Sequence, residues 1–151
     1  MFQGGSTVNL DVKGRLALPT RYRPQIIEDF NKQLVLTVHV DGCLLLYPQP
    51  VWNDIQRRLS RLPNLDKRTR MMVRMLLGHA EEVEMDAHGR IRIDQRLRDF
   101  AKLEKRISLA GVGNKFEIWN DGGWDDQCKD WQSSEELESG DMPDSFTSLT
   151  L

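Results

Sequence analysis

The sequence contains one short segment twice, and this repeat limits what the chain can fold into. Residues 11–15 read Asp-Val-Lys-Gly-Arg, and residues 86–90, 75 positions later, read Asp-Ala-His-Gly-Arg. Over the thirteen positions from 11 and from 86, an aspartate, a glycine and three arginines are identical. Residues 43–47 and Trp52 match residues 115–119 and Trp124 at an offset of 72. A copy of about 45 residues buries too little surface to be stable alone, so we expect two copies to share one core.

Each copy predicts the order β-β-α-β-β. An aspartate followed three residues later by a glycine is typical of a type I turn, with the glycine at positive φ, between two strands. Thr20 is the expected N-cap of the first helix and Asp94 that of the second. We expect strands at residues 5–10, 15–18, 34–40 and 44–47 of the first copy, and at 107–112 and 116–119 of the second.

Two helices that the repeat lacks are expected between the copies. The first spans about residues 51–62 and is stopped by Pro63, and the second is capped by Asn64 or Asp66 and ends at Gly78. The second carries a basic face that is either solvated or a surface for a partner or for a DNA backbone, made of Lys67, Arg68, Arg70 and Arg74. The predicted organisation is therefore repeat 1 at 5–52, a two-helix connector at 53–80, repeat 2 at 81–124, and a short helix with a mobile acidic tail at 125–151.

Charge is unevenly distributed along the chain. The net charge of −2 is made of +6 in residues 1–80, zero in 81–120 and −8 in 121–151. A basic body with an acidic tail indicates an anionic partner for the body. The longest apolar run, residues 43–46, is too short to cross a membrane, and no signal peptide is evident. Two cysteines form no disulfide framework, so we expect a cytoplasmic protein.

No set of residues indicates catalysis. The three histidines have no metal-ligand spacing, and His79 is expected to cap helix carbonyls. The acidic cluster at residues 81–86 suits a solvated strand edge better than the metal site of a hydrolase. Trp52 and Trp124 are interpreted as core anchors rather than a base-stacking platform. We therefore expect no enzyme activity, cofactor, metal or small-molecule substrate.

Arginines recur beside both turns and are the best candidates for binding. Arginine's planar fork can form two hydrogen bonds with a phosphate or with the edge of a guanine. Several arginines held rigidly together would bind more tightly than one, through effective concentration. The cations beside the first turn are Lys13, Arg15, Arg21 and Arg23, and those beside the second are Arg90, Arg92, Arg96 and Arg98.

Four stretches of the chain resemble MraZ proteins, a family of bacterial transcriptional regulators. They are residues 1–2 with 9–23, Leu-Leu-Tyr-Pro at 45–48, Leu-Leu-Gly-His-Ala at 76–80, and Asn-Lys-Phe-Glu-Ile-Trp at 114–119. The likeness extends to about Trp131. It implies an α+β fold of two swapped-hairpin AbrB-like ββαββ repeats that form one pseudo-twofold β-barrel, with helices between the repeats and after the second.

The resemblance also implies a function. It implies a cytoplasmic, nucleoid-associated repressor of a cell-division and cell-wall gene cluster, which regulates its own promoter. Its partners would be double-stranded DNA, read as short tandem repeats, and other copies of itself in a ring-like homo-oligomer. Lys13 and Arg15 match the family's first DNA-contacting loop, and Arg90 matches the second, where His88 replaces the lysine. Arg21 and Arg23 complete the candidate DNA-binding set. The alternative is an antitoxin-like module whose acidic tail neutralises a basic partner.

Overall fold

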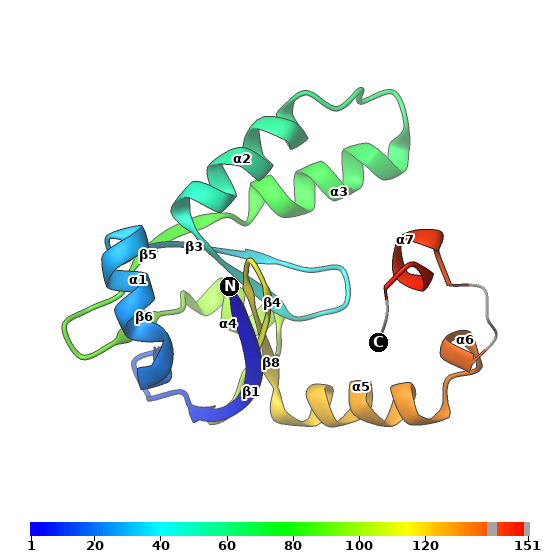
Figure 1. Cartoon of the computed structure of the whole chain (residues 1–151). Coiled ribbons are helices and arrows are strands. Elements are labelled where there is room, and N and C mark those ends of the chain that lie inside the picture. The colour runs from blue at the N-terminus through cyan, green and yellow to red at the C-terminus, as the bar shows by residue number, and fades with distance from the viewer. Residues whose placement is uncertain (139–141, 150–151) are drawn as a thin grey trace. The chain divides into compact units, whose positions relative to one another are not determined.

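The computed structural model is an α+β structure and describes residues 1–138 and 142–149 (Figure 1). Residues 1–121 form one compact unit, and residues from 122 onward belong to another. The elements of the first unit are β1 (Phe2–Asn9), β2 (Arg15–Ala17), η1 (Thr20–Tyr22), α1 (Arg23–Phe30), β3 (Gln33–Val38), β4 (Leu44–Pro48), α2 (Gln49–Ser60), α3 (Lys67–Gly78), β5 (Glu81–Glu84), β6 (Arg90–Arg92), α4 (Gln95–Phe100), β7 (Arg106–Gly113) and β8 (Phe116–Asn120). Helix α5 (Asp121–Ser133) continues from β8 and is followed by α6 (Glu135–Glu138) and α7 (Asp144–Thr147).

The strands of the two copies are interleaved. Among the described residues, six strands form a sheet in the order β1-β7-β8-β4-β3-β5, and β2 pairs with β6 in a separate ladder. Strand β1 of the first copy pairs with β7 of the second, from Phe2↔Gly113 to Asn9↔Arg106. Strand β5 of the second copy pairs with β3 of the first. If each strand is replaced by its equivalent in the other copy, the strand order read backwards is the same as the original order. This confirms two swapped repeats related by a pseudo-twofold axis.

One core lies under both the sheet and the ladder. It combines Leu16 of β2 and Ile91 of β6 with buried residues of β3, β4, β7 and β8. Tyr22 and Leu97, which match at the offset of 75, are both buried, and so are the matched residues Ile26 and Ala101. Phe2 stacks on Phe116 with ring centroids 4.2 Å apart. Each fully buried side chain of this size stabilises the fold by about 1.5–3 kcal/mol, so this shared core offsets the small size of each copy.

Helix boundaries follow the sequence with some corrections. Asp66 caps α3 as predicted, because its carboxylate accepts a hydrogen bond from the Thr69 amide, and the helix ends at Gly78. His79 lies 2.8 Å from the Met75 carbonyl oxygen through its Nδ1, which confirms its capping role. Thr20 is not an N-cap: it is the first residue of η1, α1 begins only at Arg23, and neither start has a side-chain cap. Asp94 occupies the N-cap position of α4 without a side-chain hydrogen bond.

The two predicted tryptophan anchors have different environments. Trp52 is 4% exposed and packs against Tyr47, with ring centroids 5.7 Å apart, so it is a core anchor. Trp124 is half-buried and contacts Trp131 of the same helix, α5, edge to face at 5.5 Å.

The acidic tail contains regular structure where none was predicted. The sequence from Ser133 onward indicated a mobile segment, yet the described part of it includes α6 and α7. Residues 139–141 and 150–151 of that predicted tail lie outside the described residues.

Candidate nucleic-acid interface

The first repeated turn is built around the carboxylate of Asp11. One oxygen, Oδ1, accepts hydrogen bonds from the backbone amides of Lys13 at 2.9 Å and Arg15 at 2.8 Å. The other, Oδ2, accepts one from Arg15 Nε at 2.8 Å. Gly14 takes a φ of 80°, and its amide donates to the Asp11 carbonyl at 3.0 Å. The aspartate thus shapes the turn and fixes the direction of the arginine side chain.

The second turn repeats this geometry. Asp86 Oδ1 accepts from the amides of His88 and Arg90, and Oδ2 accepts from Arg90 Nε at 2.9 Å. Gly89 has a φ of 76°. In each turn the hydrogen bond from the arginine's backbone amide is the main cause that lowers the pKa of the aspartate, and the guanidinium lowers it further. The pKa of Asp11 lies below its usual 3.8, and the pKa of Asp86 is lowered to about 2. Both carboxylates are therefore charged at neutral pH, which keeps both arginines clamped.

The β2–β6 ladder places the two clamped arginines on one outward face. Leu16 and Ile91 are opposite each other and point into the core, at 0% and 1% exposure. Because side chains alternate along a strand, their neighbours Arg15, Arg90 and Arg92 point outward. Arg15 is opposite Arg92, and Arg90 is opposite Ala17. Arg15 and Arg90 are therefore diagonal neighbours, with Cα atoms about 7–8 Å apart. Lys13 is exposed beside them.

The clamp leaves the working end of each arginine available. Only Nε of Arg15 and Nε of Arg90 is engaged, and within the described residues their terminal nitrogens, the Nη atoms, have no hydrogen-bond partner. Their side chains are 32% and 31% exposed. A guanidinium held at Nε presents its two remaining NH₂ groups in a fixed plane, which suits two hydrogen bonds to a phosphate or a guanine.

The structure does not bring Arg21 and Arg23 to this face. Arg21 stacks on the ring of Tyr22 at 4.5 Å and donates to Ser6 Oγ of β1 at 2.9 Å. Arg23 is half-buried, and its Nε donates to the Leu18 carbonyl at 2.8 Å. A DNA contact by either residue stays a prediction. Arg92, in contrast, joins the face; the sequence counted it among the cations beside the second turn but not in the DNA-binding set of Lys13, Arg15, Arg21, Arg23 and Arg90. The alternation of Arg90-Ile91-Arg92 about a buried isoleucine was the signal that indicated it.

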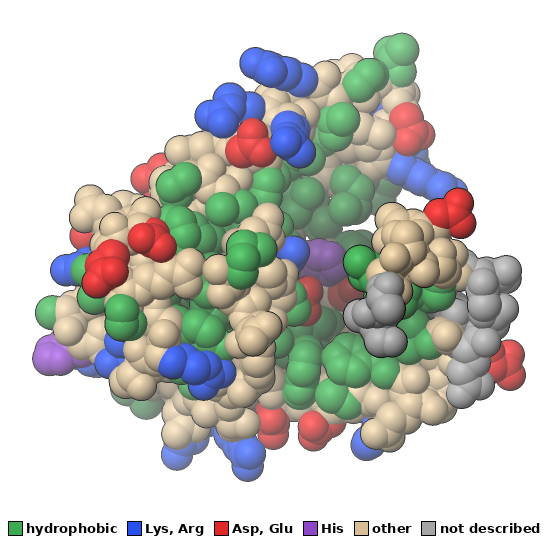
Figure 2. Space-filling view, viewed as in Figure 1, with side chains coloured by type: hydrophobic (Ala, Val, Ile, Leu, Met, Phe, Trp, Pro, Cys, Tyr) green, Lys and Arg blue, Asp and Glu red, His purple; other side chains and the backbone are tan. Residues whose placement is uncertain are grey.

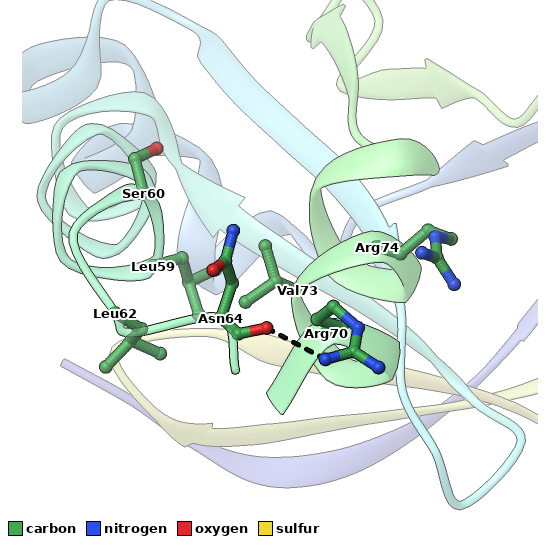
Figure 3. A pocket seen from close by; sticks show the side chains of 7 residues that line it. All are labelled: Leu59, Ser60, Leu62, Asn64, Arg70, Val73 and Arg74. Atoms are coloured by element: carbon green, nitrogen blue, oxygen red, sulfur yellow. Dashed lines mark hydrogen bonds between the residues drawn. The ribbon is translucent and has the colours of Figure 1, made fainter. Parts of the chain in front are cut away.

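A second basic surface lies on the connector. Helices α2 and α3 run side by side, and basic side chains stand out over them in Figure 2. A hollow of about 300 Å³ lies between the helices, and its apolar wall includes Leu59, Leu62 and Val73 (Figure 3). Arg70 also lines this hollow, and its Nη1 donates to the carbonyls of Asn64 at 3.0 Å and Leu65 at 2.8 Å. Arg57 and Arg58 of α2 pair with Asp54 at 3.6 and 3.2 Å, but their side chains are 62% and 80% exposed, against 32% and 31% for Arg15 and Arg90 of the ladder.

Three members of the acidic cluster, Glu81, Glu82 and Glu84, are on the edge strand β5, as the sequence predicted, whereas Asp86 lies in the second turn. Glu81 pairs with Arg96 of α4 at 3.0 Å. Among the described residues no three His, Cys, Asp or Glu side chains are grouped so that they could hold a metal ion. In the same part of the chain, no helix has the length and apolar character that a membrane crossing requires.

Comparison with known proteins identifies the family. The family model described as "MraZ protein, putative antitoxin-like" matches residues 1–75 and again residues 76–141. A "Transcriptional regulator MraZ" of Thioalkalivibrio sulfidiphilus is 46% identical over 151 residues and covers all of both chains. Proteins of the same name are 46% identical over 91% of both chains in Methylococcus capsulatus, and 45% identical over the whole of both chains in Escherichia coli. With its two interleaved repeats and two matched family segments, the chain belongs to the MraZ family.

Proposed function

We propose that this protein is a DNA-binding transcriptional regulator that grips double-stranded DNA with the outward face of the β2–β6 ladder. We further propose that it represses its own promoter, which lies within a cell-division and cell-wall gene cluster. In this proposal the protein is cytoplasmic and nucleoid-associated, and it binds short tandem DNA repeats as a ring of identical chains. Its relatives' name supports regulation of transcription. The observation that carries the proposal is the pair of arginines held at Nε, whose terminal nitrogens have no hydrogen-bond partner among the described residues.

Physical dimensions support this surface. The major groove of B-DNA is about 12 Å wide and admits a two-stranded β-ribbon. The Cα atoms of Arg15 and Arg90 are about 7–8 Å apart, so both guanidinium groups fit within one groove. Each bidentate guanine contact discriminates by about 1–3 kcal/mol, and each phosphate contact adds affinity that falls with salt. Several chains in one assembly would multiply these modest contributions on tandem repeats.

Binding of the protein to the DNA upstream of its own gene tests the proposal. Arg15→Ala is expected to weaken binding by about 5- to 150-fold, since it removes one bidentate contact worth about 1–3 kcal/mol. Arg58→Ala is the matched control, because it removes the same charge from an exposed site on α2 that is paired with Asp54. Fluorescence anisotropy at fixed salt gives both affinities. Equal affinities of Arg15→Ala and Arg58→Ala for this DNA would refute the ladder as the interface.

A second function has specific support. The family description includes "putative antitoxin-like", and the segment 121–151 carries a net charge of −8. An antitoxin-like role predicts a small basic protein bound in stoichiometric amount when the protein is purified from its native host. Purification without such a protein, together with promoter binding, favours the regulator.

A further inference from the structure

Each turn glycine rests on an arginine from the opposite copy of the repeat. A Cβ atom placed on Gly14 would lie 2.9 Å from Arg98 Cζ and 3.0 Å from Arg98 Nε. A Cβ atom on Gly89 would overlap the guanidinium of Arg23 and lie 2.6 Å from its Cδ. Gly14 belongs to the first copy and Arg98 to α4 of the second, whereas Gly89 belongs to the second copy and Arg23 to α1 of the first. Each copy therefore supplies the arginine that lies under the turn of the other copy.

Backbone hydrogen bonds also connect each turn glycine with the opposite copy of the repeat. The Ile93 amide donates to the Gly14 carbonyl at 2.8 Å, and the Leu18 amide donates to the Gly89 carbonyl at 2.8 Å. Arg23 Nε donates to the carbonyl of Leu18, the same residue whose amide binds the Gly89 carbonyl. In the part of the chain that is described, Arg98 Nε is buried and has no hydrogen-bond partner. A buried donor without a partner is uncommon in proteins. Packing under the turn is the interaction that the structure shows for this group.

We propose that Arg98 and Arg23 are positioning residues for DNA binding, each holding the DNA-contacting turn of the other copy. Arg98 fixes the turn that carries Lys13 and Arg15, and Arg23 fixes the turn that carries Arg90. The inference rests on the proposed function, because it assigns the two turns to DNA. A flat guanidinium fits beneath a residue that has no side chain, and it excludes water from that space. Lysine cannot replace it, since its ammonium is compact, strongly hydrated and not planar.

Double-mutant cycles that combine Arg98 or Arg23 with Arg15 or Arg90 test which turn each supporting arginine holds, with DNA affinity as the measured quantity. Arg98→Ala is expected to weaken binding to the upstream DNA about tenfold, within the range seen for residues that share one network. In an Arg15→Ala background the same substitution should have a smaller effect, because the turn that it positions keeps only the Lys13 contact. In an Arg90→Ala background it should keep its full effect. Arg23→Ala should show the reverse pattern. Stronger coupling of Arg98 to Arg90 than to Arg15 would overturn the proposal.

A measurement on the free protein separates this proposal from the DNA function. Arg98→Ala should speed amide hydrogen exchange at Gly14 and Arg15 and leave Gly89 and Arg90 unchanged, and Arg98→Lys should not restore protection. Arg96→Ala is the matched control, since Arg96 lies on the same helix but is exposed and paired with Glu81. If Arg15→Ala binds DNA as well as the original protein does, the proposed DNA function is wrong. Amide hydrogen exchange in the free protein still measures whether Arg98 supports the turn. Exchange that rises throughout the core, or equally in both turns, would overturn the proposed support.

Discussion

Gly89→Ala should destabilise the protein far more than an ordinary glycine substitution. The φ of 76° at this position costs an L-residue about 1–2 kcal/mol. The new methyl group would also overlap the half-buried guanidinium of Arg23, which cannot simply swing into solvent because its Nε is bonded to the Leu18 carbonyl. Overpacking of this kind typically costs about 1–3 kcal/mol. Together the two effects predict a loss of about 2–5 kcal/mol in the free energy of unfolding.

Gly42→Ala is the matched control for this prediction. Gly42 also has a positive φ, 95°, but a Cβ there would meet nothing within 4 Å. Its substitution should therefore cost only the backbone contribution of about 1–2 kcal/mol. Urea unfolding followed by tryptophan fluorescence compares the two variants. With a slope of about 1–3 kcal/mol per molar urea, the Gly89→Ala midpoint should lie below that of Gly42→Ala by roughly 1 M. Equal midpoints would show that the arginine does not press against the turn and would refute the packing described here.

Three further predictions concern the clamps, the core and the tail. Since the pKa of Asp86 is lowered from 3.8 to about 2 in the folded protein, its contribution to stability is present above about pH 4 and is lost as pH falls toward 2; the stability difference from Asp86→Asn, measured by urea unfolding, should shrink over that interval, and a constant difference would contradict the clamp. Trp52→Ala should lower the free energy of unfolding by about 3–5 kcal/mol, whereas Trp131→Ala, at a half-exposed residue, should cost less than about 1 kcal/mol in the same assay. Deleting residues 133–151, which are strongly acidic, should raise affinity for unrelated DNA at low salt; unchanged affinity in an anisotropy titration would reject screening of the basic body by the tail.

The repeat in the sequence was sufficient to predict most of the fold. Two copies of one ββαββ pattern, each too small to be stable alone, imply a shared core, and the structure has that core. The aspartate and glycine of each turn predicted its hydrogen bonds, because a type I turn with a positive-φ glycine needs those residue types. The strand exchange was implied only by the family resemblance. Pairing between β1 and β7, about a hundred residues apart, has no local signature in the chain.

The candidate site was only partly predictable. The sequence placed Arg15 and Arg90 beside turns, and the clamp by Asp11 and Asp86 accounts for that spacing. It could not show that the two arginines share one face, which depends on the register between β2 and β6. Nor could it show that Arg23, unlike Arg15, packs under Gly89, a residue of the other copy. The hydrogen bonds of Arg15 to Asp11 and this packing of Arg23 together distinguish the two arginines.

Side-chain NMR of the arginines tests the central claim most directly. The Nε–H groups of Arg15 and Arg90 are held by carboxylates, so their signals should be sharp and resolved in the free protein. On titration with the DNA upstream of the gene, these two signals should shift together, while that of Arg58 on α2 stays in place. DNA binding that shifts arginine signals of the connector and leaves those of Arg15 and Arg90 unchanged would contradict the account.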